Sequence, residues 1–184
     1  RYRATIYSYK LQLFDPSWFL PNGPDIAERL KAQLQVKNDP KLQTATMAYL
    51  EDFKLGGRVQ MSDLTPAVIR HYLKHQIPVI AGLSATFLYR SQREFGENCD
   101  YDDIRGEPSG HFVVLCGYDS KAKDVLIADP LHTNPLSSAQ IYRSPVAHVI
   151  NAILLGVLTY DGNMIILQPT EQKRPSHAEP HRRR

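Results

Sequence analysis

Two neighbouring stretches near the middle of the chain decide the fold: residues 110–119 read GHFVVLCGYD and residues 124–130 read DVLIADP. Both are rich in the β-branched and aromatic residues that strands favour. The polar residues between them suit a hairpin turn. Pro130 ends the second strand, because proline cannot donate to a strand ladder. The pattern predicts an antiparallel β-hairpin.

This predicted hairpin would bring His111 close to Asp129. If the turn is centred near Ser120, Asp129 lies opposite His111, and a later centre puts residue 131 or 132 there. In either register the roots of the two side chains are roughly 5–8 Å apart. A carboxylate beside one imidazole nitrogen fixes the tautomer of the ring and stabilises the imidazolium. The spacing suits either a general base with its orienting carboxylate or a structural pair at a strand end. Gly110 is expected to leave room for the backbone of a ligand.

The flanking sequence predicts helices first and strands afterwards, which is an α+β class. Residue types that cap helices precede the apolar periods at Asp25, Asp39 and Thr65, and Gly56 with Gly57 ends the second helix. The sequence predicts strands at 2–9, 11–14, 58–61 and 78–83, and helices at 26–36, at 40–54 and from 65. Residues 84–89 suit either a strand or a helix, and residues 90–110 read as a polar loop. A short helix is predicted from 144, and a hairpin is predicted from 153–160 and 163–168 around Asp161 and Gly162. We therefore expect a helical section at 25–76 followed by an antiparallel sheet at 77–168.

Charge and composition exclude several classes of protein. The chain has 184 residues and a net charge of +3. Residues 169–184 carry this surplus, with five basic against two acidic side chains, so residues 1–168 balance to zero. We predict one domain over 1–168, a disordered basic tail over 169–184, and no nucleic-acid partner. No apolar run reaches the ~18–20 residues of a membrane span. The start of the chain reads as a strand and not as a secretory signal, and two cysteines make no disulfide framework. These features predict a reducing compartment, the cytoplasm.

The two central stretches resemble the second half of a papain-like cysteine peptidase. Specifically, they are similar to the family thirty-nine cysteine peptidases, whose best-known members trim double-glycine leaders from bacteriocins. Residues 110–119 match the histidine strand of that family, residues 125–130 match the strand that ends in Asp-Pro, and residues 78–82 match the preceding core strand. The resemblance covers residues 77–130 and implies a papain-like fold, a peptide or protein substrate, and no cofactor or metal. It also implies that His111 is the general base and acid, and that Asp129 orients it.

The sequence departs from that family at the nucleophile. The family carries a cysteine in a Cys-Gly-Pro motif at the start of a helix, with an oxyanion glutamine a few residues before it, and neither motif occurs here. The resemblance then implies either that the nucleophilic cysteine lies upstream of Arg1, or that the protein is a peptide-binding module that has lost its nucleophile. The chain as given would be inactive in both cases, and its oligomeric state stays open.

The resident cysteines fit the role of nucleophile poorly. Cys116 lies five residues after His111 in one strand and therefore faces the opposite side, so a buried structural thiol is expected. Cys99 lies in an acidic loop, and nearby negative charge disfavours a thiolate.

Three further patterns are incomplete. Residues 82–86 lack the last glycine of a serine-hydrolase elbow. The acidic run from Asp100 has histidine where a calcium loop needs its final glutamate. His71 and His75 are spaced for zinc without a third ligand.

Overall fold

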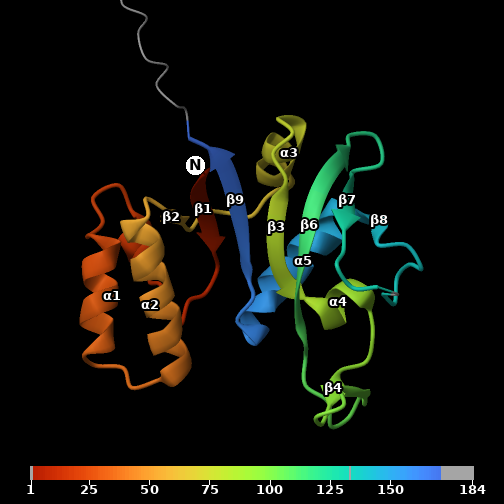
Figure 1. Ribbon diagram of the computed structural model, residues 1–184, viewed down its shortest axis with the longest axis horizontal. Helices are drawn as coiled ribbons and strands as arrows, with labels where there is room; N and C mark the ends of the chain where they lie inside the picture. Colours follow the sequence, from red (N-terminus) through yellow and green to blue (C-terminus); the bar gives the residue numbers. More distant parts are fainter. Residues whose placement is uncertain (1, 133, 171–184) are drawn as a thin grey trace, which may run out of the picture.

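A seven-stranded sheet organises the molecule in the order β2-β1-β9-β3-β6-β7-β8 (Figure 1). The computed structural model describes residues 2–132 and 134–170. The strands of the seven-stranded sheet are β1 (Tyr2–Ser8), β2 (Arg58–Gln60), β3 (Val79–Ser84), β6 (Gly110–Asp119), β7 (Asp124–Ala128), β8 (Ile141–Pro145) and β9 (Asn163–Pro169). The β1–β2 pair is parallel and every other pair is antiparallel. The predicted α+β class with a mostly antiparallel sheet is confirmed.

In the described part of the chain, five α-helices and two 3-10 helices accompany this sheet. They are η1 (Pro16–Phe19), α1 (Ile26–Leu34), α2 (Pro40–Lys54), α3 (Pro66–Lys74), α4 (Ala85–Tyr89), α5 (Val146–Leu155) and η2 (Gly156–Thr159). The carboxylate of Asp25 accepts from the backbone N–H of Glu28, and that of Asp39 accepts from the N–H groups of Lys41 and Leu42. These bonds satisfy donors at the start of α1 and α2, as the sequence predicted.

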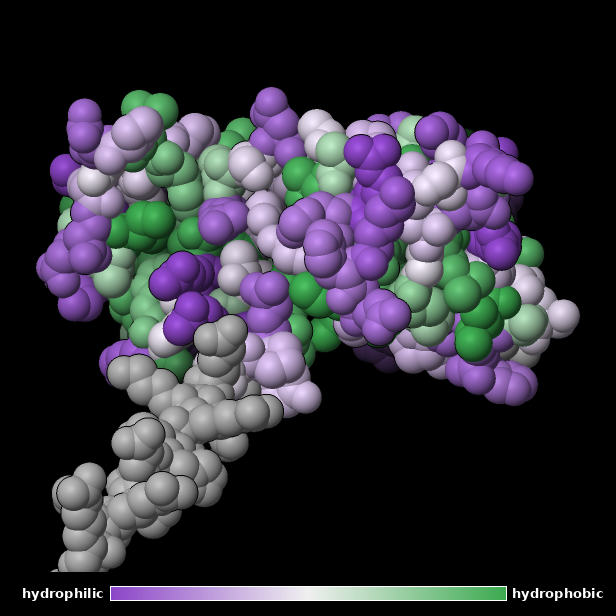
Figure 2. All heavy atoms as spheres, turned by 90° about the horizontal axis from the view of Figure 1, so that it is seen from above, coloured by the Kyte–Doolittle hydropathy of each residue, from purple (hydrophilic) through white to green (hydrophobic). Residues whose placement is uncertain are grey.

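Two apolar cores lie against the sheet. The larger one joins α3, α4 and α5 to one face of the central strands, with members such as Ile69, Leu88, Val113 and Ile153. The smaller one holds α1 and α2 together around Phe14. Figure 1 shows α1 and α2 side by side next to β2, with α5 running behind the central strands. The end of the sheet where β1 begins carries mainly hydrophilic side chains with apolar patches between them (Figure 2).

Two predicted strands are wrong because their apolar residues are used differently. Residues 11–14 form a turn in which the backbone N–H groups of Leu13 and Phe14 both donate to Lys10 O, and the two apolar side chains enter the smaller core. Residues 153–159 belong to α5 and η2, Tyr160 caps η2, and this segment forms no hairpin with β9. An all-apolar run does not distinguish a buried helix from a strand.

The sheet also departs from the predicted order of elements. β1 and β2 belong to it, α5 interrupts its strands, and β8 has no counterpart in the prediction. The undecided segment 84–89 is helix α4, and the predicted loop at 90–110 contains the small hairpin β4 (Glu94–Phe95) and β5 (Asp100–Tyr101). β9 ends at Pro169, one residue into the predicted tail, and residues 171–184 lie outside the described residues.

Across residues 2–132 and 134–170, no helix combines the length and apolar character needed to cross a bilayer.

Candidate active site

The hairpin of β6 and β7 brings His111 and Asp129 together. Val114 pairs with Ala128, and Leu115 pairs with Ile127, so Asp129 follows β7 at a position diagonal to His111. The two side chains meet with His111 Nε2 2.9 Å from Asp129 Oδ1. The turn gives a later register than a centre at Ser120 would give, and a β-bulge between Leu115 and Gly117 then shifts the pairing by one residue.

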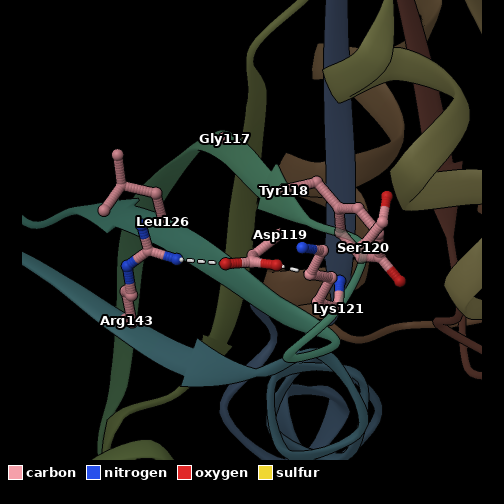
Figure 3. A pocket seen from close by; sticks show the side chains of 7 residues that line it. All are labelled: Gly117, Tyr118, Asp119, Ser120, Lys121, Leu126 and Arg143. Carbon is pink, nitrogen blue, oxygen red and sulfur yellow. Dashed lines mark hydrogen bonds and ion pairs between the residues drawn. The ribbon is translucent and has the colours of Figure 1, made fainter.

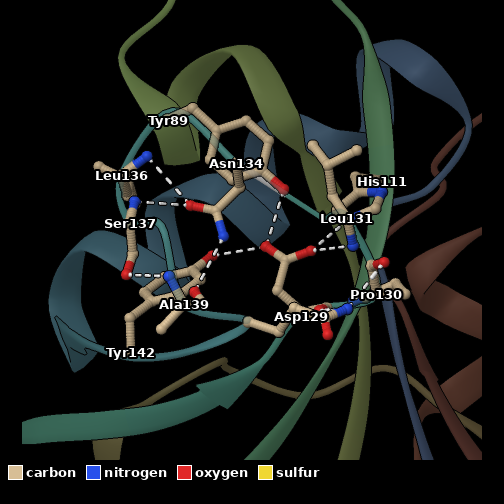
Figure 4. Close-up of polar contacts among 11 residues, drawn as sticks. Tyr89, His111, Asp129, Pro130, Leu131, Asn134, Leu136, Ser137, Ala139 and Tyr142 are labelled. Atoms are coloured by element: carbon tan, nitrogen blue, oxygen red, sulfur yellow. Dashed lines mark hydrogen bonds and ion pairs between the residues drawn. The ribbon is translucent and has the colours of Figure 1, made fainter.

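The carboxylate of Asp129 is surrounded by donors (Figure 4). Its side chain has no exposed surface. Oδ1 accepts from His111 Nε2 and from the backbone N–H of Leu131, at 2.9 Å each. Oδ2 accepts from the hydroxyl of Tyr89 at 2.8 Å and from that of Tyr142 at 2.7 Å. Burial alone would raise the pKa of Asp129, but these four hydrogen bonds together hold its pKa below the ordinary value.

Sequence reasoning missed both tyrosines. Tyr89 is the last residue of α4, in the segment that the sequence left undecided, and Tyr142 lies in β8, which it did not predict. Burial, followed by the hydrogen bond to the Asp129 carboxylate, raises the pKa of each phenol. Both hydroxyls therefore stay protonated and donate. No local signal in the sequence marks a tyrosine that will reach a distant aspartate.

The hydrogen bond to Asp129 fixes the state of the His111 ring. An ionised carboxylate only accepts, so Nε2 must carry the proton that is donated. In the neutral ring the lone pair then resides on Nδ1. Within the described ranges nothing donates to or accepts from Nδ1, and 22% of the side chain is exposed. His111 is thus an oriented base whose second nitrogen is free to take a proton.

The space expected at Gly110 is filled by the chain itself. A Cβ on this glycine would overlap the carboxylate of Asp161 and lie 2.7 Å from Thr159 Oγ1. The loop before β9 packs against the start of β6, so a side chain at residue 110 would have to displace the side chains of Asp161 and Thr159. The expectation that Gly110 leaves room for a ligand's backbone is wrong.

Neither resident cysteine contacts this pair of side chains. Cys116 is exposed, so the expected buried thiol is wrong. It lies at the β-bulge, where pairing with β7 is interrupted, and its Sγ lies 3.5 Å from Leu126 O. Cys99 is also exposed, in a left-handed backbone conformation with φ of 55°. The structure places no thiol of the described residues beside His111.

The remaining sequence candidates are occupied locally. Ser84 Oγ accepts from Phe87 N as the cap of α4. Asp102 accepts from its own loop, from the backbone N–H of Ile104 and from Arg105. The described part of the chain contains no group of three or more His, Cys, Asp or Glu side chains that could hold a metal ion, and His71 with His75 stays a pair.

A pocket of about 360 Å³ lies at the β6–β7 turn, where the side chains of Asp119 and Arg143 are paired with each other (Figure 3). Arg143 Nη1 donates to Asp119 Oδ2 at 3.0 Å, and Asp119 Oδ1 accepts from the backbone N–H groups of Lys121 and Ala122. The turn lies at the opposite end of β6 from His111. These polar contacts stabilise the hairpin that carries the His–Asp pair.

Comparison with known proteins places this sequence in a family. The model of the family described as "Peptidase_C39 like family" matches residues 35–151. Among solved structures, the chain is similar to a candidate C39-like peptidase from Bacillus anthracis, with 20% identity and a TM-score of 0.32. The match covers 58% of this chain and 48% of the other, so the chain spans about half the length of that structure. No curated protein matches the chain.

Proposed function

The chain belongs to the Peptidase_C39 like family, and from this premise we propose that it is the base-carrying part of a cysteine peptidase-like hydrolase that acts on peptide or amide bonds. The observation that carries the proposal is the His111–Asp129 pair, in which Nε2 is hydrogen-bonded to a buried carboxylate and Nδ1 has no hydrogen-bond partner among the described residues. This is the arrangement that activates a thiol in nucleophilic catalysis.

The proposed reaction begins with a proton moving from a cysteine thiol to His111 Nδ1. The resulting imidazolium is stabilised by the Asp129 carboxylate, and the thiolate attacks the carbonyl carbon of the scissile bond. His111 then gives its proton to the leaving amine, which breaks the C–N bond and leaves a thioester. Water attacks the thioester with His111 again as base, releasing the acid and restoring the thiol.

We propose that the nucleophile precedes Arg1. The family's Cys-Gly-Pro motif is absent from residues 1–184, and the two cysteines present do not contact the pair.

Both described cysteines are free thiols, which supports our proposal of a reducing compartment such as the cytoplasm.

The test is alkylation of the complete gene product by iodoacetamide. His111→Ala should slow labelling of the reactive cysteine by roughly tenfold or more, because the thiolate loses its base. His71→Ala is the matched control, since His71 is exposed on α3 and contacts neither member of the pair. Equal labelling rates in the His111→Ala variant and the parent would contradict the role of His111 as activating base.

A second candidate is a peptide-binding module without catalysis. One observation favours it: an apolar depression of about 530 Å³ lies beside Asp129 and is lined by Ile80, Phe112 and Ile141. Phe112 is 42% exposed and faces the side of β6 opposite to His111. Calorimetric binding of an apolar peptide by a complete protein that shows no reactive thiol and leaves the peptide intact would favour this function over hydrolysis.

A further inference from the structure

We propose that Tyr89 and Tyr142 are positioning residues for the His111–Asp129 pair: their hydroxyl groups hold Asp129 by Oδ2 and so aim Oδ1 at His111 Nε2. This role deepens the proposed function and rests on it. The two phenols do not touch the reacting atoms, and they act through Asp129.

All hydrogen-bonding sites of the Asp129 carboxylate are occupied, so the group is held in one orientation. An ionised carboxylate accepts about four hydrogen bonds. All four are made here, two by the tyrosines on Oδ2 and two by His111 and the Leu131 backbone on Oδ1. Rotation about the Cβ–Cγ bond would break each of them, and the Asp129 side chain has no exposed surface at which water could replace them. Without the phenols Oδ2 would be buried and unsatisfied, and the orientation of Oδ1 would depend on two donors alone.

The tyrosines approach from two independently anchored elements. Tyr89 ends α4, whose first turn is held by the Ser84 cap and by the hydrogen bond from Ala85 N to Ser109 O. Tyr142 pairs with Ile127 across β7 and β8, and the backbone N–H of Asp129 donates to Gln140 O. A carboxylate held between a helix and a strand keeps one orientation when either of them moves alone.

Neutral donors suit this role better than cations. A lysine or arginine on Oδ2 would compete with the imidazolium for the charge of Asp129. The titratable groups that hydrogen-bond Asp129 from the elements around it are Tyr89 on α4, Tyr142 on β8 and His111 on β6. His111 is therefore the one partner able to carry positive charge among those described. The Tyr89 ring also lies against the imidazole, with the centroids 6.1 Å apart.

The experiment compares Tyr89→Phe, Tyr142→Phe and the double variant with the parent chain by NMR. Nitrogen-15 shifts of the His111 ring report its tautomer at a pH where it is neutral, and the carbon-13 shift of the Asp129 carboxyl reports its titration. We expect one Nε2–H tautomer in the parent, a mixture of both tautomers in the double variant, and a higher titration midpoint for Asp129 in each variant. Tyr118→Phe is the matched control, because Tyr118 lies at the far end of β6 and should change neither signal.

Unchanged tautomer and midpoint in a folded double variant would overturn the proposal and leave the phenols as packing groups. If the double variant does not fold, the titration midpoint of Asp129 in the two single variants tests the proposal, and unchanged midpoints in both would overturn it. The NMR readout needs no activity, so it separates this proposal from the proposed function. In the complete protein we expect each Tyr→Phe change to slow alkylation of the reactive cysteine roughly tenfold, the equivalent of one charge-assisted hydrogen bond.

Discussion

Asp129 is a charged side chain from which solvent is fully excluded. A buried carboxylate is tolerated when its lone pairs are satisfied, and isolated burial would instead favour the neutral acid. Four donors from β6, α4, β8 and the chain just after Asp129 meet that requirement. The pair is therefore more than an incidental contact at a strand end. The fold brings donors from several elements to one carboxylate, and the side chain of His111 is more open to solvent than the buried side chains of Tyr89 and Tyr142.

Two glycines of the sheet differ in what a methyl group would meet. We expect Gly82→Ala to lower the free energy of unfolding by about 2–3 kcal/mol, because a Cβ there would overlap the backbone oxygen of Asp161 and lie 2.8 Å from the Phe112 ring. Gly117→Ala is the control in the same sheet, with its nearest atom, Leu126 Cβ, at 3.2 Å, and should cost less than about 1 kcal/mol. Urea unfolding of both variants measures the difference. Equal losses of unfolding free energy in the two variants would contradict this prediction and show that the loop at Asp161 moves aside for the methyl group.

At the scale of elements, α4 links the core to the site. It is five residues long, too short to be stable by helix propensity alone, so its position depends on its cap and on tertiary packing. Ser84 at its start and Tyr89 at its end are separated by one turn and a half of helix, about 7–8 Å of rise. A change at the Ser84 cap should therefore alter the hydrogen bond that Tyr89 donates to Asp129.

We expect Ser84→Ala to destabilise the protein by about 1 kcal/mol through loss of the bond to Phe87 N. We also expect it to raise the titration midpoint of Asp129, because Tyr89 is held less firmly. Asp25→Ala is the matched control, since it removes the cap of α1 at a comparable cost and α1 does not contact the site. Thermal unfolding and the carbon-13 titration are measured together. A shift of the Asp129 midpoint in the Asp25→Ala variant would mean that general loss of stability, and not α4, controls the site.

The sequence was most informative where local chemistry decides the structure. The caps at Asp25 and Asp39 and the alternating residues of β6 and β7 predicted their elements, and the hairpin spacing predicted that His111 and Asp129 would approach each other. Residues 153–160 were mispredicted because their apolar side chains suit a buried helix and a strand equally. Tyr89 and Tyr142 could not be found, since their role depends on the contact of α4 and β8 with a residue distant in sequence.

At the scale of the whole molecule, the sheet separates two kinds of surface. Its central strands are covered on one face by α3, α4 and α5, and the His–Asp pair lies at the α4 end of that face. On the other face of β6, Phe112 is partly exposed, and Ile80 and Ile141 line the same depression. The strand that presents the base on one side thus presents apolar surface on the other, and both features depend on the register of one hairpin.

The acid stability of the whole protein should depend on Asp129. Its pKa in the folded state lies below the ordinary 3.8, so its ionised form contributes stability that is fully present above about pH 4 and is lost as the pH falls through the lower folded value. Asp52 acts in the opposite sense, because burial raises its pKa and its contribution declines as the pH rises. We expect Asp129→Asn to flatten the fall in unfolding free energy below pH 4.

The control for this measurement is Asp119→Asn. The pKa of Asp119 is also lowered, by backbone N–H donors at the β6–β7 turn, but the group is open to solvent and its contribution is screened. The unfolding free energy of the Asp119→Asn variant should therefore fall at acid pH nearly as steeply as that of the parent. Chemical unfolding at a series of pH values from neutral to about 3 gives the three curves. An Asp129→Asn variant with the same acid slope as the parent would show that folding does not lower the pKa of Asp129, so that the hydrogen bonds to its carboxylate do not favour the ionised form on which the proposed mechanism relies.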